Sequence, residues 1–300
     1  MKISKALVDS DFDGVVCGAL LSIVFPGLNI RLTEASALQS GRDKDFVDEN
    51  TVVADLSYVE GCGLYFDHHH SNEPKREIVG KWELLNSAAE VIYNYYKDKF
   101  DLVRYEGLIQ QLGRFDSGLT TLKDMMEMNN YLLMGFAIER QDKEFSLKLI
   151  KELAEFAWDD VLEKEFVKEK LQKCRHDIEQ YYDYLKKNTV FEGNIAFIDN
   201  RDFNGNMAHA YFLATTYPQL DAIIMLRQVK DDYRITMFWN NFKKDSFKYD
   251  LLAVAKELNP VVSGGHKGAC GASVKANLSV EDLKKKIFSM LKQQVAEDLI

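Results

Sequence analysis

Three consecutive histidines beside an aspartate are the chain's strongest candidates for chemistry. A short apolar run ends at residue 66 and is followed directly by Asp67, His68, His69 and His70. Neutral imidazole is a common ligand of divalent transition metals, and an adjacent carboxylate can orient the ring or share the metal. Taken alone, the histidines fit a solvated His-rich or tag-like tract equally well. The choice depends on what else the chain supplies.

A cluster of carboxylates near the N-terminus offers further metal ligands. Asp9, Asp11 and Asp13 alternate with other residues and are followed by Gly14. Carboxylates spaced in this way on a loop can reach one point, and the glycine allows the backbone to turn sharply into a helix. A calcium-binding EF-hand loop has similar spacing, but it needs a Glu at its twelfth position, which is missing here, and in this chain a strand precedes the loop. The pattern therefore disfavours an EF-hand.

Each of these clusters follows an apolar segment that predicts a β-strand. Residues 5–8 precede Asp9, the β-branched run 51–54 precedes Asp55, and residues 63–66 precede Asp67. In open α/β sheets, ligands bind beyond the carboxyl ends of the parallel strands. Three strand ends that carry acids or imidazoles therefore predict one site at this edge of a sheet.

Other elements must position these strand ends. The apolar spacing predicts a strand over 28–32 and helices over 15–23, 87–100 and 105–112, with Ser87 as an N-cap. A turn bracketed by Gly113 and Gly118 follows the last of these helices and contains Asp116, which by itself would most often be a turn or capping residue. The long stretch 142–187 has no Pro or Gly and predicts a helical connector.

The remainder of the chain predicts a second domain that starts near Val190. Its expected strands and helices, in order, cover residues 195–198, 208–217, 222–229, 233–239 and 251–258. A glycine-rich stretch follows over 263–272, containing Gly264, Gly265, His266 and Lys267. Such a loop exposes backbone N–H groups and two cationic or donor side chains to an anion, although it could also be a structural bend. The last helix is expected to begin at Ser279 and to run to the C-terminus.

Composition limits the classes of function. The chain has 300 residues, of which 46% are hydrophobic, as expected for two globular domains. Its formal charge of −9 opposes tight binding to long nucleic acids, which requires many lysines and arginines. The N-terminus lacks a signal-peptide core, and no apolar run has the ~20 residues of a membrane span, so we expect a cytoplasmic protein without membrane contact. The four cysteines form no motif of a disulfide framework or zinc site.

Taken together, the motifs make the chain resemble the DHH phosphoesterase family. The matching positions, in order, are Asp9-x-Asp11-x-Asp13-Gly14, Asp55, Asp67-His68-His69, Asp116 and Gly264-Gly265-His266-Lys267. The resemblance covers essentially the whole chain. It implies an α/β fold with a parallel-sheet DHH catalytic domain over 1–140, a helical connector over 141–188, and a smaller mixed-sheet, substrate-binding domain over 189–300.

The resemblance also implies roles for individual residues. Two divalent cations, by preference Mn²⁺, would be held by Asp9, Asp11 and Asp55 on one side and by Asp13, Asp55, His68 and Asp116 on the other. Asp55 would bridge the two ions and, with His69, act in catalysis. Asp67 would orient the neighbouring histidines, and His69 would lie near the substrate phosphate. The loop of Gly264, Gly265, His266 and Lys267 would bind phosphate or ribose groups.

Three positions depart from the family pattern. Asp9 replaces the histidine that many relatives have, as in single-strand exonucleases of the RecJ type, and Ser263 replaces a glycine. Phe238 lies where relatives of the nanoRNase/pAp-phosphatase type carry a substrate-binding arginine. Arg227, Arg234 or Lys267 could supply that charge, or Phe238 and Trp239 could stack on a base.

The sequence therefore predicts a metal-dependent hydrolase of phosphodiester or phosphomonoester bonds. Its expected substrates are short oligonucleotides or small phosphonucleotides, because the acidic chain lacks a long cationic groove. An exopolyphosphatase, a cyclic nucleotide phosphodiesterase and a single-strand exonuclease remain open within the same class, whereas the Gly-Gly-His loop argues against a family II pyrophosphatase. A non-catalytic metal and nucleotide sensor is the alternative from another class. The oligomeric state is open, a homodimer included.

Overall fold

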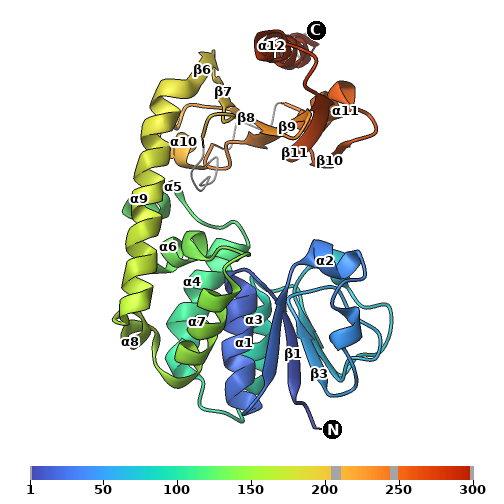
Figure 1. The fold of residues 1–300 in the computed structure, drawn as a ribbon, viewed down its shortest axis with the longest axis vertical. Helices are drawn as coiled ribbons and strands as arrows, with labels where there is room; N and C mark the ends of the chain where they lie inside the picture. Colours follow the sequence, from blue (N-terminus) through green and yellow to red (C-terminus); the bar gives the residue numbers. More distant parts are fainter. Residues whose placement is uncertain (1, 204–210, 244–248, 298–300) are drawn as a thin grey trace. The chain divides into compact units, whose positions relative to one another are not determined.

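The chain forms two compact units. The computed structural model describes residues 2–203, 211–243 and 249–297. The first unit contains residues 1–120 and 127–174, and the second contains residues 121–126 and 175–300. The predicted connector is divided between them: the helices α7 (Lys143–Glu155) and α8 (Trp158–Leu162) belong to the first unit, and the long helix α9 (Glu165–Asn188) continues from the first unit into the second (Figure 1).

The first unit is built on a five-stranded parallel sheet. The strand order is β2-β1-β3-β4-β5, and all four pairings are parallel. The strands are β1 (Lys5–Asp9), β2 (Asn29–Thr33), β3 (Thr51–Ala54), β4 (Leu64–Asp67) and β5 (Gly80–Trp82). The residues of β3 and β4 are buried throughout, as expected for a parallel sheet that is covered on both faces. The predicted parallel-sheet domain is confirmed.

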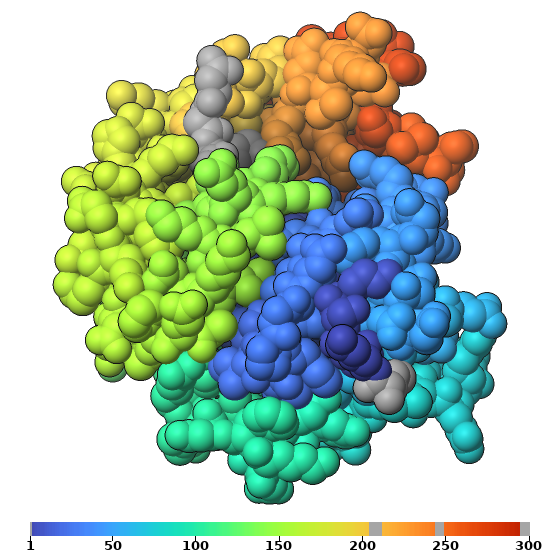
Figure 2. All heavy atoms as spheres, turned by 60° about the horizontal axis from the view of Figure 1, so that its bottom comes forward, coloured from blue at the N-terminus to red at the C-terminus, as the bar shows by residue number. Residues whose placement is uncertain are grey.

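Helices and short turns cover both faces of this sheet (Figure 1). One face is packed by α2 (Ala35–Gln39) and the 3₁₀ turn at 44–46, whose Leu38 and Phe46 contact Leu7, Val53 and Tyr65. The other helices of the unit are α1 (Phe12–Val24), α3 (Ala88–Tyr96), α4 (Glu106–Asp116) and α6 (Asn130–Ala137). The helix α1 packs against α3 and α7, and Figure 2 shows the atoms of α7, in yellow-green, directly against those of α1, in blue.

The position of Asp116 differs from the prediction. The helix α4 does not stop before Gly113 but continues through it, so Asp116 is the last residue of the helix rather than part of a glycine-bracketed turn. Gly113 serves packing: a Cβ there would lie 2.9 Å from the Cβ of Asn86, just before α3. The glycine therefore allows α4 to approach the start of α3 closely, which places Asp116 at the site.

The second unit has a mixed six-stranded sheet, and the predicted mixed-sheet C-terminal domain is confirmed. The strand order is β10-β11-β9-β8-β7-β6, and only the pairing of β7 with β8 is parallel. The strands are β6 (Thr189–Glu192), β7 (Ile195–Asp199), β8 (Ala222–Val229), β9 (Asp232–Trp239), β10 (Ser263–His266) and β11 (Ala269–Lys275). The core lies between the sheet and the helices α11 (Leu251–Leu258) and α12 (Val280–Glu297), where Ile235 and Met237 are fully buried.

Two predictions for the second unit agree with the structure only in part. The glycine-rich stretch is not a loop. Most of it forms the hairpin of β10 and β11, because β11 pairs with residues 232–238 of β9 and β10 pairs with β11. Glycine is depleted from strands, so the glycine-rich composition predicted a loop where the structure has two strands. Of the helix expected over 208–217, the structure has α10 (Tyr211–Thr216), and residues 208–210 lie outside the described residues. The remaining helix of the described residues is α5 (Leu122–Glu127).

Two smaller findings concern the helices. Ser279 and Asp282 hydrogen-bond each other at the start of α12, as the sequence predicts. Within the described residues, none of the helices combines the length and the apolar character that a membrane crossing requires.

Candidate metal centre

The carboxyl ends of three neighbouring strands converge, as the sequence predicts. The strands β1, β3 and β4 are adjacent in the sheet and end in or immediately before Asp9, Asp55 and Asp67. Asp55 has a positive φ of 58°, a left-handed conformation in which Asp and Asn are enriched. The unusual backbone turns this side chain off the strand end into the site.

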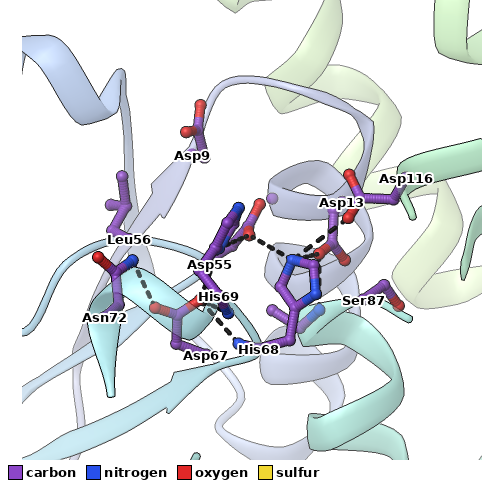
Figure 3. A network of polar contacts seen from close by, with 12 residues as sticks. Asp9, Asp13, Asp55, Leu56, Asp67, His68, His69, Asn72, Ser87 and Asp116 are labelled. Atoms are coloured by element: carbon purple, nitrogen blue, oxygen red, sulfur yellow. Dashed lines mark hydrogen bonds and ion pairs between the residues drawn. The ribbon is translucent and has the colours of Figure 1, made fainter. Parts of the chain in front are cut away.

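The ring of His68 lies at the centre of the cluster. Its Nε2 atom is 3.2 Å from Asp116 Oδ2, 3.7 Å from Asp55 Oδ1 and 3.8 Å from Asp13 Oδ2, and Figure 3 shows the three carboxylates pointing toward the ring. The other ring nitrogen, Nδ1, is 3.2 Å from the carbonyl oxygen of Leu85. Because a carbonyl can only accept, Nδ1 carries the proton and Nε2 presents a lone pair.

Two atoms of the cluster are buried without a hydrogen-bond partner, His68 Nε2 and Asp55 Oδ1. Burial, followed by the neighbouring His69, lowers the pKa of His68, so its ring is neutral at physiological pH. A buried lone pair that faces three carboxylates is costly unless a cation lies between them. These two atoms are therefore suited to ligate a metal ion.

Asp13 is held by the N-terminus of another helix. Its oxygens accept hydrogen bonds from the backbone N–H groups of Ala88, at 2.6 Å, and Ala89, at 2.9 Å, in the first turn of α3. The positive end of a helix dipole favours a carboxylate there. Its neighbour Cys17 is a protonated thiol, because burial raises its pKa well above the ordinary value. The centre thus offers oxygen and imidazole ligands without thiolate.

Both oxygens of Asp67 accept hydrogen bonds from neighbouring residues, so this carboxylate mainly positions its neighbours. Its Oδ1 accepts from the backbone N–H groups of His68 and His69 and contacts His69 Nδ1 at 2.9 Å, and its Oδ2 accepts from Tyr65 and Asn72. Although burial opposes ionisation, these hydrogen bonds lower the pKa of Asp67. The hydrogen bond to Asp67 in turn raises the pKa of His69, whose side chain is 48% exposed.

The structure does not bring Asp9 and Asp11 into the cluster. Among the described residues, the ligand atoms that lie within 4.8 Å of one another come from Asp13, His68 and Asp116, and from Asp55, Asp67, His68 and His69. Asp9 and Asp11 instead contact Arg140, whose two terminal nitrogens lie 2.5 Å from Asp9 Oδ1 and 2.9 Å from Asp11 Oδ2. The role of Arg140 leaves no signal in the sequence, because this residue belongs to no motif and lies more than a hundred residues from its partners.

The carboxylates of the centre carry more negative charge than the protein compensates. Burial, with further contributions from neighbouring acids, raises the pKa of Asp9 to about 6 and that of Asp116 to about 7. Burial likewise raises the pKa values of Asp13 and Asp55 well above the ordinary range. Divalent cations would remove this repulsion, and the carboxylate and imidazole ligands suit Mn²⁺ or Mg²⁺. The residues present therefore fit the metal ions that the resemblance implies.

The residues expected to bind substrate in the second unit lie in and around the hairpin of β10 and β11. A groove of about 840 Å³ runs along this part of the sheet and includes Ser263 and Gly264 but not Gly265, His266 or Lys267. Gly265, at φ 122°, is required by packing, since a Cβ there would lie 2.6 Å from the Cα of Cys270. The groove is also lined by Arg234, Thr236 and Lys275.

No protein-family model matches the chain, and no curated protein sequence matches it. Among solved structures, the pGpG-specific phosphodiesterase PggH of Vibrio cholerae superposes with a TM-score of 0.81 at 19% identity, over 98% of this chain and 99% of that one. The DHH domain of a member of a family of ribosomal proteins gives a TM-score of 0.59 at 12% identity, over 98% of this chain and 86% of that one.

The chain has the fold of the DHH proteins. RecJ of Thermus thermophilus, solved in complex with Mn²⁺, also shares this fold, with a TM-score of 0.55 at 11% identity. That match covers 97% of this chain but only 52% of RecJ, so the DHH fold seen here corresponds to about half of the exonuclease. The fold that the resemblance implies is thus confirmed for both units.

Proposed function

We propose that this protein is a metal-dependent phosphoesterase of the DHH family that hydrolyses short oligonucleotides or small phosphonucleotides. The observation that carries the proposal is the unpartnered, buried Nε2 atom of His68, which faces Asp13, Asp55 and Asp116. A structural histidine at such a position would be expected to satisfy both ring nitrogens. The proposal assigns this arrangement to catalysis because the same fold occurs in a nucleotide phosphodiesterase and in RecJ.

Two divalent cations would be held by the residues named from the sequence. Asp13, Asp55, His68 and Asp116 would hold the first, and Asp9 and Asp11, with Asp55 as the shared ligand, would hold the second. Bound cations of this kind supply Lewis acidity, which lowers the pKa of water and stabilises charge on phosphoryl oxygens. We favour Mn²⁺ over Mg²⁺ because an imidazole is among the ligands.

The side chain of His69 would contact the phosphate group. The hydrogen bond that His69 Nδ1 donates to Asp67 fixes the ring and raises the pKa of His69, so the ring keeps a proton closer to neutral pH. A protonated, half-exposed imidazole beside the centre can donate a hydrogen bond to a phosphoryl oxygen and a proton to the leaving group. Asp67 would therefore act through His69, and His69 would act on the substrate.

The second unit would bind nucleotide through its own groove. The groove combines the cationic side chain of Arg234 with the hydroxyl groups of Thr236 and Ser263, and the Oγ of Ser263 is buried without a partner. The exposed side chains of Val261 and Val262 add an apolar wall. These features suit a phosphate and an adjoining base or sugar better than a long strand. The nucleotide substrate named for PggH is a dinucleotide, which agrees with this size.

A panel of substrates tests the proposal. Purified protein would be incubated with Mn²⁺ and with dinucleotides, single strands of increasing length in RNA and DNA, cyclic nucleotides and polyphosphate. We expect kcat/KM to be highest for substrates of a few nucleotides and to vanish with a chelator. A steady rise of kcat/KM with strand length would favour a processive exonuclease, and hydrolysis of polyphosphate alone would favour an exopolyphosphatase. Binding of nucleotides without any hydrolysis would support the sensor alternative.

A further inference from the structure

Arg140 forms a fork across the two carboxylates that the cluster leaves out. It lies between α6 and α7, and its terminal nitrogens contact Asp9 Oδ1 and Asp11 Oδ2. Within the described part of the chain, these are the ion pairs that Asp9 and Asp11 make. A planar guanidinium group matches two such oxygens better than a lysine does. The protein therefore supplies its own cation to this pair of aspartates.

Among the described residues, the remaining ligands of the centre have no arginine or lysine partner. Asp55 Oδ1 and His68 Nε2 are buried without a hydrogen-bond partner, Asp55 Oδ1 lies 3.7 Å from a nitrogen of each of the two histidine rings, and Asp13 and Asp116 face the His68 ring. One half of the centre is thus open to a metal ion, while Arg140 compensates part of the negative charge of the other half. A guanidinium group and a divalent ion repel each other, and Arg140 already contacts one oxygen of each carboxylate, so close binding of both cations by Asp9 and Asp11 is unfavourable.

We infer that Arg140 competes with the second cation and that the centre fills in two unequal steps. The first ion binds to Asp13, Asp55, His68 and Asp116 while Arg140 stays in place. The second ion binds to Asp9 and Asp11 only after the guanidinium withdraws, and its affinity is lower for that reason. Withdrawal is feasible because the Arg140 side chain is 41% exposed and lies in an interhelical segment. The inference rests on the proposed function only in that the centre binds divalent cations.

Calorimetric titration of metal-free protein with Mn²⁺ tests the competition. The wild type should show one Mn²⁺ site of high affinity and one of lower affinity. In Arg140→Gln the site of lower affinity should bind Mn²⁺ about tenfold more tightly, since hydrogen bonds to charged groups no longer have to be broken. Arg140→Lys should lie between the two, because an ammonium group cannot bridge both carboxylates in the same way.

The control is Arg31→Gln, which removes an exposed arginine–aspartate contact, to Asp43 at 3.2 Å, elsewhere in the same unit. It should leave both affinities unchanged. Weaker or unchanged binding of the second ion in Arg140→Gln would overturn the competition, because the guanidinium would then orient the carboxylates or have no effect. If Arg140→Gln does not fold, the shift in Arg140→Lys decides in the same way. A wild type that binds no Mn²⁺ would contradict the proposed function, whereas two sites of equal affinity would contradict only the competition.

Discussion

A backbone carbonyl determines which nitrogen of His68 is free. The Leu85 oxygen accepts from Nδ1, and Nε2 is thereby presented to Asp13, Asp55 and Asp116. Asp67 has the corresponding role for His69, whose ring it holds at 2.9 Å. Adjacent histidines of the same motif thus receive different roles: a neutral ring faces the metal centre, and a more basic ring faces solvent.

The three histidines of the motif provide a matched test of these roles. His68→Ala should weaken the binding of the first Mn²⁺ at least about tenfold, because it removes the central imidazole. His69→Ala should keep metal binding near the wild-type level but lower kcat. His70→Ala is the control, since its exposed side chain lies outside the metal-binding groups. Titration calorimetry with steady-state kinetics checks all three, and equal loss of metal in His69→Ala would contradict the division of roles.

The raised pKa values of the carboxylates predict an unusual pH dependence of stability without metal. The pKa values of Asp9 and Asp116 rise from 3.8 to about 6 and about 7. Above 3.8 the unfolded chain has lost these protons while the folded chain still holds them, so stability falls as the pH rises toward about 7. Below pH 3.8 these carboxyl groups are protonated in both the folded and the unfolded chain, so they no longer make stability depend on pH.

The measurement is the Tm of chelator-treated protein at about pH 5 and about pH 8. We expect a lower Tm at the higher pH, and a larger gain in Tm from Mn²⁺ there, because the ions bind deprotonated carboxylates. Asp116→Asn should reduce the difference between the two pH values. A Tm that is equal or higher at the higher pH without metal would show that the carboxylates are compensated in another way.

The contributions of Arg140 and Leu85 could not be predicted from the sequence. The ligands stand in short motifs at strand ends, where residue type and spacing are visible. Arg140 reaches Asp9 only through the packing of helices that are remote in sequence, and Leu85 acts through its carbonyl group, which every residue has. Tertiary contacts of this kind leave no local pattern.

At the level of elements, close helix packing brings Asp116 to the site. Gly113 allows α4 to approach the start of α3, whose N-terminus holds Asp13. The strands β1, β3 and β4 were predictable because each is a short apolar run that ends in an acid. The edge strand β5 was not predictable, since it has three residues and little apolar character. The strand β10 was not predictable either, because two of its four residues are glycines.

Substitutions at two glycines of α4, one closely packed and one exposed, test whether this packing matters. In Gly113→Ala the new methyl group would meet Asn86, so we expect a loss of about 1–3 kcal/mol in the free energy of unfolding. We also expect weaker Mn²⁺ binding, because Asp116 is displaced. Gly107→Ala is the control: this exposed position has only the Tyr131 hydroxyl nearby, at 3.7 Å, and should gain about 0.5–1 kcal/mol from helix propensity. Denaturant unfolding with metal titration checks both, and an unaffected Gly113→Ala would show that the contact relaxes freely.

At the scale of the whole molecule, the candidate metal ligands and the groove lie in different units. The first unit contains all the candidate metal ligands, and the second unit contains the groove with Arg234 and Ser263. The order of motifs predicted both folds, and the match to PggH spans nearly the full length of each chain. The identity of the substrate could not be predicted, because it depends on a groove whose residues come from separate strands and turns of the second unit.

The central claim is that the carboxylate and histidine centre performs metal-dependent hydrolysis. Asp55→Asn tests it most directly, because asparagine also adopts the positive φ of this position and keeps the shape of the side chain while removing its charge. The measurement is the rate of Mn²⁺-dependent hydrolysis of a dinucleotide, with bound Mn²⁺ determined on the same samples. We predict that the variant folds normally, loses bound metal and falls at least about a hundredfold in kcat/KM. Near-normal turnover by the variant, or wild-type turnover that persists in a chelator, would contradict the account.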